Sequence, residues 1–141
     1  MITIRIANWA EPADREALKA IRAEVFLREQ RVPEAEEMDA FDTESIHLLA
    51  STETNDFLGC ARLMATGQIG RMAVQRKQRG QGIGGMLLDA AIAEAKRQAR
   101  TQIFLHAQCH AESFYARFGF HRVGSIFSEA DIEHVKMVLQ E

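Results

Sequence analysis

The chain has 141 residues, of which 47% are hydrophobic and 26% are charged, and its 17 basic and 20 acidic side chains give a net charge of −3. This length predicts one domain over residues 1–141 with a single hydrophobic core. The weak acidity argues against a protein that coats nucleic acid. No apolar run reaches the roughly 18 residues of a membrane span, and the first residues alternate like a strand rather than a signal peptide.

The cysteine content is low and its spacing is uninformative for metal binding. Cys60 and Cys109 stand far apart and outside any C-x-x-C pattern. A disulfide framework or a zinc site is therefore not expected. The low cysteine content instead predicts a cytoplasmic protein in a reducing environment.

The first third of the chain predicts one strand and one helix. Residues 2–7 alternate as in a strand. A helix is expected over residues 12–29, because Leu18, Ile21 and Val25 recur at helical spacing and a proline opens the segment.

An acidic segment follows that helix. Pro33 prevents its simple continuation, and six of the residues in 34–44 are acidic. Because a run of like charges is typical of a solvated surface, we expect a solvated loop or a frayed turn there.

Three successive strands are predicted next, over residues 47–51, 57–64 and 68–75. They are followed by a helix over residues 80–99, which has an apolar stripe at helical spacing.

The last third predicts a compact strand over residues 101–107, a short helix over 110–118 and two final strands, 120–123 and 133–139. The order of all these elements predicts an α/β fold with a mixed sheet, since three strands in succession argue against a purely doubly wound arrangement.

The most informative segment runs Arg79-Gly80-Gln81-Gly82-Ile83-Gly84-Gly85, between a strand and a helix. Glycines let backbone N–H groups approach an anion without interference from Cβ, and a helix N-terminus adds positive potential. Arg76, Lys77 and Arg79 add positive charge beside it. The segment therefore predicts a phosphate-binding loop.

The segment matches two other glycine-rich phosphate-binding signatures less well. Gly80-x-Gly82-x-x-Gly85 satisfies the dinucleotide fingerprint, but polar residues separate it from the strand and no acid follows about 20 residues later to bind a ribose. A Walker A loop is excluded because no Gly-Lys-Ser/Thr closes the segment. A glycine-rich turn that only starts the helix stays open as a structural alternative.

Arg79-x-x-Gly82-x-Gly84 resembles the Arg/Gln-x-x-Gly-x-Gly/Ala signature of GNAT N-acetyltransferases, whose loop binds the pyrophosphate of acetyl-CoA. The order of elements and residues 114–120 resemble the same superfamily. Further segments are similar to its small bacterial YjcF/ElaA-like branch, namely residues 25–33, 37–42, 106–108 and the tail Phe127-x-Glu129-x-x-Ile132-x-His134. The resemblance covers nearly the whole chain. It implies a mixed, mostly antiparallel central sheet with helices on both faces.

The resemblance also implies the reaction, which is transfer of the acetyl group of acetyl-CoA to an amine by direct attack in a ternary complex, without a metal. It assigns cofactor binding to Met72, Ala73, Val74, Arg79, Gly80, Gln81, Gly82, Ile83 and Gly84. Backbone donors on residues 72–74, in a strand that splays from the next, would stabilise the charge that grows on the carbonyl oxygen.

Tyr115 stands at the family's position for the group that stabilises the leaving thiolate, and it is the only tyrosine in the chain. Its other interpretation is a core aromatic residue, because it lies on the apolar stripe of its helix. His106 and Gln108 are expected either to shape the acetyl site or to cap the following helix. An acetyl intermediate on Cys109 is disfavoured, since no base partner is identifiable.

The general base is not identified by the sequence. Many relatives keep an acid on the strand that corresponds to residues 69–74, and this chain has none there. The candidates are Glu29, Asp39, Asp42, His47 and His134. A non-catalytic acyl-CoA-binding or regulatory module is therefore kept as the alternative to an enzyme, ahead of a nicotinamide-dinucleotide protein.

The charges leave the acceptor open. Residues 1–70 carry 7 basic and 13 acidic side chains, whereas residues 71–141 carry 10 and 7, so the anion-binding loop lies in the positive half. The acids of 34–44 can attract a cationic amine, whereas Arg62 and Arg71 can bind an acidic group. The acceptor is expected to be a small molecule or a peptide, with no nucleic acid or membrane partner; a homodimer stays open, as many relatives dimerise.

Overall fold

The computed structural model describes residues 1–139, and within them seven strands form one sheet in the order β1-β2-β3-β4-β5-β7-β6. Neighbouring strands are antiparallel except β4 and β5, which are parallel. The sheet is therefore mixed and mostly antiparallel, as expected. The strands are β1 (Ile2–Ala7), β2 (Ile46–Thr52), β3 (Phe57–Leu63), β4 (Gln68–Val74), β5 (Phe104–Gln108), β6 (Phe120–Glu129) and β7 (Ile132–Leu139).

The three predicted helices are present, and short helical turns are added in the segments between them. The long first helix is α-helical as α1 and continues with wider, π-type turns as η1. No helix among residues 1–139 has the length and apolar character needed to cross a membrane. The helical elements are α1 (Pro12–Arg22), η1 (Ala23–Glu29), α2 (Glu34–Glu37), η2 (Asp42–Glu44), η3 (Arg76–Gln78), α3 (Ile83–Arg97), η4 (Cys109–Ala111) and α4 (Glu112–Ala116).

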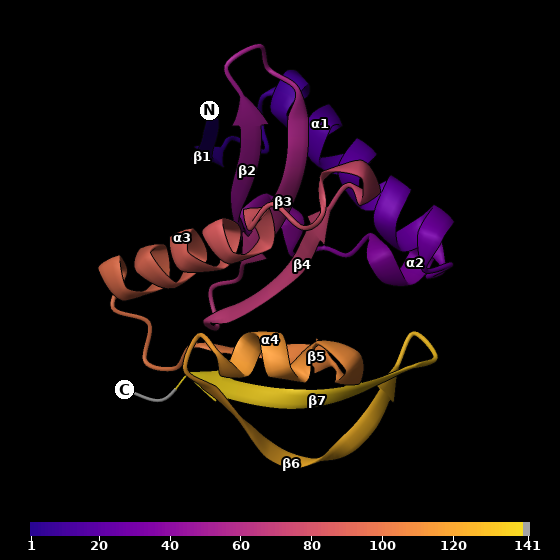
Figure 1. Cartoon of the computed structure of the whole chain (residues 1–141), viewed down its shortest axis with the longest axis vertical. Coiled ribbons are helices and arrows are strands. Elements are labelled where there is room, and N and C mark those ends of the chain that lie inside the picture. Colours follow the sequence, from indigo (N-terminus) through magenta and orange to yellow (C-terminus); the bar gives the residue numbers. More distant parts are fainter. Residues whose placement is uncertain (140–141) are drawn as a thin grey trace.

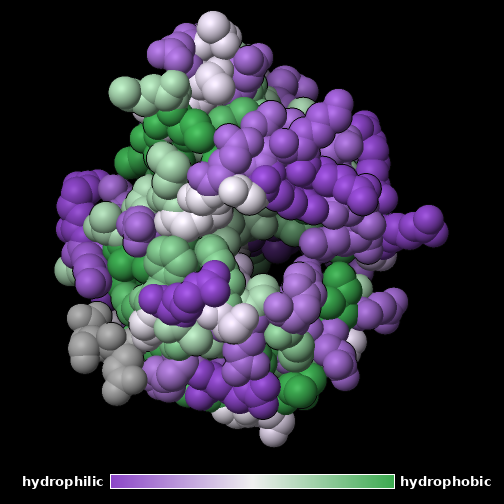
Figure 2. All heavy atoms as spheres, in the orientation of Figure 1, coloured by the Kyte–Doolittle hydropathy of each residue, from purple (hydrophilic) through white to green (hydrophobic). Residues whose placement is uncertain are grey.

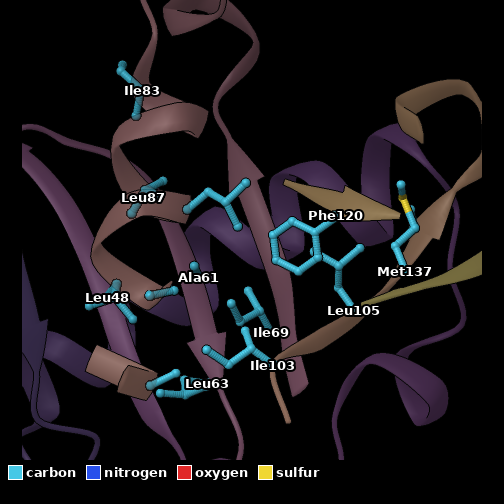
Figure 3. Close-up of a cluster of buried hydrophobic side chains, with 14 of the residues drawn as sticks. Leu48, Ala61, Leu63, Ile69, Ile83, Leu87, Ile103, Leu105, Phe120 and Met137 are labelled. Atoms are coloured by element: carbon cyan, nitrogen blue, oxygen red, sulfur yellow. The ribbon is translucent and has the colours of Figure 1, made fainter. Parts of the chain in front are cut away.

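Helices cover both faces of the sheet around β2 and β3 (Figure 1). Side chains alternate along a strand, so Leu48 packs under α3 while its neighbour Leu49 packs under α1. Figure 3 shows Ile83 and Leu87 of α3 above strand residues such as Ala61. The strands from β2 to β4 are thus the rigid centre on which the rest of the molecule is built.

The parallel contact between β4 and β5 is short. Only the pairs Gln68–Phe104 and Ile69–Leu105 are in register, although β4 continues to Val74. Beyond Ile69 the two strands separate, so the edge of β4 that faces β5 has no strand partner there. The splayed strand implied by the family resemblance is present.

A β-bulge shapes the same part of β4. The register with β3 shifts between the pairs Cys60–Ala73 and Arg62–Gly70, and Arg71 adopts the left-handed conformation with φ of 47°. A bulge of this kind redirects a side chain and bends the strand. In β4 it turns Arg71 toward the acidic segment 34–44.

That acidic segment is solvated only in part. It forms two short helical turns, α2 and η2, and most of its residues are exposed as expected, but Glu37 and Asp42 are only 3% exposed. The physical reason is Arg22, which is itself 1% exposed and donates hydrogen bonds to both carboxylates. Buried opposite charges that pair in this way pull an acidic segment onto the body of the protein.

Candidate active site

A cavity of about 1210 Å³ lies where β4 and β5 separate. It runs from the glycine loop at the start of α3, along β4, to the ends of β5 and β7. Figure 2 shows the surface hollowed in this region, between the part that carries α1 and α2 and the part formed by β5–β7. The cavity therefore joins the predicted phosphate loop to side chains from both halves of the sheet.

The glycine loop has the geometry of an anion cradle. Gly80 and Gly82 have φ angles of 85° and 80°, and no atom lies within 4 Å of the position that a Cβ would occupy on either. Gly82 begins α3 without a side-chain cap, so the first N–H groups of this 15-residue helix face the loop without an intrahelical acceptor. These donors fit a phosphate group. Gly85 serves packing instead, since a Cβ there would lie 3.0 Å from Cζ of Phe118.

Arg79 connects the loop to the end of η1. Its two terminal nitrogens donate to the carboxylate of Glu29 at 2.6 and 2.7 Å, and its Nε donates to the carbonyl of Val74 at 3.0 Å. The hydrogen bond from Arg79 lowers the pKa of Glu29, and the same bond raises the pKa of Arg79. Glu29 is therefore held as a carboxylate in an ion pair, which makes it a poor general base.

The residues predicted to bind the cofactor lie together, with one exception. Arg79, Gly80, Gly82, Ile83 and Gly84 line the cavity, and so does the β4 stretch 72–74. Gln81 does not line it; its side-chain amide donates to that of Gln78 on the outside of the loop.

Tyr115 also lines the cavity, from α4. Its ring packs edge-to-face against Phe114 and Phe120, at centroid distances of 5.1 and 6.3 Å. Burial raises its pKa to about 12. Tyr115 is thus a packed aromatic residue that lines the cavity and keeps its hydroxyl proton throughout the neutral pH range.

The wall opposite α4 is a network of ion pairs. Arg62 donates to Asp39 at 2.8 Å and to Asp42 at 3.0 Å, and Arg71 lies 3.0 Å from carboxylate oxygens of Glu37 and Asp39. Burial is the largest single influence on Asp39 and opposes its charge, but the hydrogen bonds and charge of Arg62, the N–H of Phe41 and the charge of Arg71 together lower the pKa of this residue. Asp39 is therefore a partner of the arginines rather than a free base.

Asp42 and His47 do not line the cavity. Asp42 is buried between Arg22 and Arg62, which hold its pKa below the ordinary value in spite of burial. His47 is stacked on Trp9 at 4.7 Å and donates from Nε2 to the carbonyl of Asp42. Burial lowers the pKa of His47, so it is a neutral, structural histidine. Neither residue can reach an acceptor in the cavity.

His134 is the candidate base that lies in the cavity without a guanidinium partner. Its Nδ1 donates to the carbonyl of Ile132 at 2.7 Å, and its Nε2 lies 3.7 Å from Oε2 of Glu129. On the adjacent strand, Nδ1 of His106 lies 3.4 Å from Oε1 of Glu129. Glu129 therefore stands between two cavity histidines, one from β5 and one from β7.

The sequence did not single out Glu129 as a functional side chain. Its position depends on the tight turn between β6 and β7, where Ala130 and Asp131 both have positive φ, and Glu129 pairs with Ile132. Such a two-residue turn is usually marked by Asn-Gly or Asp-Gly, and Ala-Asp carries no such mark. The signal in the sequence that included Glu129 was the similarity of residues 127–134 to the YjcF/ElaA-like branch.

The end of β5 contributes side chains beside these histidines. The amide of Gln108 donates to Gln30 at 2.9 Å and so connects β5 to the end of the first helix. Gln108 also accepts a hydrogen bond from Nε2 of His110 at 2.7 Å. Cys109 does not line the cavity. Within residues 1–139 no group of three or more His, Cys, Asp or Glu side chains is arranged to hold a metal ion.

Comparison with known proteins identifies the family. The sequence profile described as acetyltransferase (GNAT) domain matches residues 10–141. The uncharacterised N-acetyltransferase YjcF of Bacillus subtilis is 30% identical over 122 residues, which cover 84% of this chain and 86% of YjcF. The crystal structure of Escherichia coli ElaA superposes with a TM-score of 0.89 at 25% identity, over 99% of this chain and 100% of ElaA. A GNAT acetyltransferase of Elizabethkingia anophelis, crystallised with acetyl-CoA bound, has a TM-score of 0.63 at 22% identity, covering 97% and 94% of the two chains.

The chain therefore belongs to the GNAT acetyltransferase family. It is an acyltransferase enzyme that takes its acetyl group from acetyl-CoA. The family and fold class predicted from the sequence are confirmed, and the dinucleotide interpretation of the glycine loop is excluded.

Proposed function

We propose that the chain works as a single catalytic domain, with acetyl-CoA in the cavity between β4 and β5 and the amine acceptor at its far end. The pyrophosphate would lie on the N–H groups of Gly82, Ile83 and Gly84, where the open space around two left-handed glycines supports it. The pantetheine arm would follow the unpaired edge of β4, whose backbone groups can pair with its amides.

In this arrangement the acetyl carbonyl lies beside β4 residues 72–74. Attack by an amine places negative charge on the carbonyl oxygen, and a backbone N–H from the unpaired edge of β4 would stabilise it. Such donors are fixed by the sheet before the reaction begins, so they need no reorganisation as charge develops.

Tyr115 would stabilise the departing thiolate. Because its pKa is about 12, the phenol keeps its proton and acts by donating a hydrogen bond to the sulfur as charge grows there. The packing of its ring between Phe114 and Phe120 restricts the direction of the hydroxyl. Tyr115 is thus assigned as a catalytic residue and the glycine loop as the cofactor-binding segment.

The observation that carries this proposal is the continuity of one cavity, lined by the glycine loop at one end and by Tyr115, His106 and His134 further along. A module that only binds acyl-CoA needs the first part. The charged and titratable side chains along the second part are what a transferase needs in order to bind and deprotonate an acceptor.

The test is thiol release from acetyl-CoA in the presence of a panel of amines, polyamines, amino acids and peptides, together with calorimetric titration of acetyl-CoA. We expect binding of acetyl-CoA and amine-dependent thiol release. Binding without release for every acceptor would favour the non-catalytic acyl-CoA-binding module. Absence of binding would contradict the proposed site.

A further inference from the structure

The arginines of the cavity are already paired. Five carboxylates and three guanidinium groups line it, and each guanidinium has a carboxylate partner within 3.0 Å: Arg62 with Asp39, Arg71 with Glu37 and Asp39, and Arg79 with Glu29. Behind the wall, Arg22 pairs with Glu37 and Asp42. An acceptor carboxylate would therefore meet an excess of negative charge and would have to displace an existing ion pair to reach a guanidinium.

Glu36 and Glu129 are the two cavity carboxylates that form no ion pair with a guanidinium, and Glu129 is the one that lies beside the two cavity histidines. Its side chain is 50% exposed, and its recorded ionic neighbours are His106 at 3.4 Å and His134 at 3.7 Å. The hydrogen bond from His106 lowers its pKa, although burial acts in the opposite direction. At neutral pH Glu129 is thus a carboxylate that faces the cavity and is available to a cation.

The tautomer of His134 is fixed by its surroundings. A carbonyl oxygen can only accept, so Nδ1 of His134, which lies 2.7 Å from the carbonyl of Ile132, carries a hydrogen. In the neutral ring Nε2 then has a free lone pair, and this atom lies 3.7 Å from Oε2 of Glu129. Two acceptors at this separation are both satisfied when a donor with several N–H groups binds against them.

We propose that Glu129 and Nε2 of His134 form the acceptor site, that Glu129 binds the ammonium group of a primary amine, and that His134 takes its proton. The inference rests on the proposed function and deepens it by naming the acceptor class. The acceptor is a cationic amine whose remaining part is neutral or positively charged, rather than an amino acid or another carboxylate-bearing amine.

The protons balance as follows. The ammonium loses one proton to Nε2 of His134, and the resulting neutral amine attacks the thioester carbonyl, which forms the C–N bond. The C–S bond breaks as the tetrahedral intermediate collapses, and the thiolate leaves against the hydroxyl of Tyr115. The nitrogen then loses a second proton. One of the two protons protonates the thiolate and the other passes to solvent, so that each turnover releases one proton.

Glu129 also lies beside the ring of His134, with its Oε2 3.7 Å from Nε2. The other charged or titratable groups that face Glu129 are His106 from β5 and, at longer range, Arg71 from β4. Phe127 of β6 stacks on His134 and contributes no charge.

Two variants separate the roles of the pair. Glu129→Gln keeps the size of the side chain and removes its charge, and we expect the KM for the amine to rise about 10-fold or more. His134→Gln should lower kcat by about 100-fold or more, a typical loss for a general base. Acetyl-CoA affinity should be unchanged in both variants.

Glu133→Gln is the matched control. Glu133 is an exposed acid of β7 that does not line the cavity, and this change removes the same charge. We expect its kinetics to equal those of the parent protein. His134 is 7% exposed, so its replacement can disturb packing. Glu129 is half exposed, so the Glu129→Gln variant tests the site without a risk to folding.

The acceptor class is tested with putrescine, butylamine and γ-aminobutyrate, which share a four-carbon chain and differ in the charge at its far end. We expect kcat/KM to fall in that order, by about 10-fold or more from first to last, as the cavity charge repels a carboxylate. A preference for γ-aminobutyrate, or an unchanged KM for the amine in Glu129→Gln, would overturn the inference. If acetyl-CoA binds but none of the three amines causes thiol release, the proposed acceptor site is wrong and the proposed cofactor site is still supported. If the parent protein does not bind acetyl-CoA, the proposed function itself is contradicted.

Discussion

Arg79 of the glycine loop and Glu29 at the end of η1 form a two-point ion pair, with N–O distances of 2.6 and 2.7 Å. The pair joins residues that are fifty positions apart, and it places a carboxylate beside the loop that is proposed to hold a pyrophosphate. An incoming anion therefore competes with Glu29 for the same guanidinium.

Glu29→Gln should strengthen binding of acetyl-CoA, since it removes a negative charge from the edge of the phosphate site and frees Arg79. We expect the Kd to fall by about threefold to tenfold at low ionic strength and the difference to shrink as salt is added. Stability should change by less than about 1 kcal/mol, because the pair is partly exposed. The control is Glu24→Gln, which breaks the exposed pair with Arg28 away from the cavity and should leave the Kd unchanged.

Gly82→Val should abolish acetyl-CoA binding in a folded protein. Valine is strained at a φ of 80°, by about 1–2 kcal/mol, and its side chain would occupy the space proposed for the phosphate. Gly124 has the same φ of 80° and equally open surroundings, but it lies in the bulge of β6 and outside the cavity. Gly124→Val should therefore lose a similar amount of stability by thermal unfolding and keep its affinity in calorimetry. Equal affinities in the two variants would contradict the assignment of the loop.

Tyr115→Phe should lower kcat by about 100-fold while the Kd of acetyl-CoA and the melting temperature stay near the parental values. The phenyl ring retains the packing against Phe114 and Phe120, and no hydrogen bond from the hydroxyl to another of the described residues is lost. Thiol release and thermal unfolding measure the two effects separately. Turnover at the parental rate would show that the hydroxyl does not stabilise the thiolate.

Arg22→Met should cost about 3–5 kcal/mol at neutral pH, because it leaves Glu37 and Asp42 buried without this partner. In the parent protein the pKa of Asp42 is depressed on folding, so its contribution is complete above the unfolded value of about 3.8 and is lost as the pH falls through the folded value. Urea unfolding should therefore show parental stability falling below about pH 4. Below about pH 4 the difference in unfolding free energy between the parent protein and Arg22→Met should become smaller. A difference that does not change with pH would show that the ion pair of Arg22 with Asp42 does not stabilise the fold.

Much of the architecture was predictable because it depends on local pattern. The apolar stripe of α3 and the alternation in β2–β4 predict their elements, since one face of each must be buried. The glycines of residues 80–85 predict an anion site, because their backbone freedom has few other uses at a helix start. The β4 segment 72–74, by contrast, was predicted to bind the cofactor only from the family resemblance.

Two residues of the acidic segment show where local pattern fails. Six acids in 34–44 predict solvent exposure, yet Glu37 and Asp42 are buried because Arg22 and Arg62, distant in sequence, supply the opposite charges. The burial of a charge depends on its partner. No property of the segment itself contains that information.

The amino-acid sequence by itself therefore determined the order of the main elements and the resemblance that names the family, and it predicted a phosphate-binding loop. Only the tertiary structure distinguished the candidate bases: Glu29 and Asp39 are held in ion pairs, Asp42 and His47 are buried outside the cavity, and His134 faces Glu129 inside it. The basicity and reach of a side chain depend on burial, charge and hydrogen bonds contributed by other strands, and those neighbours come together only when the chain folds.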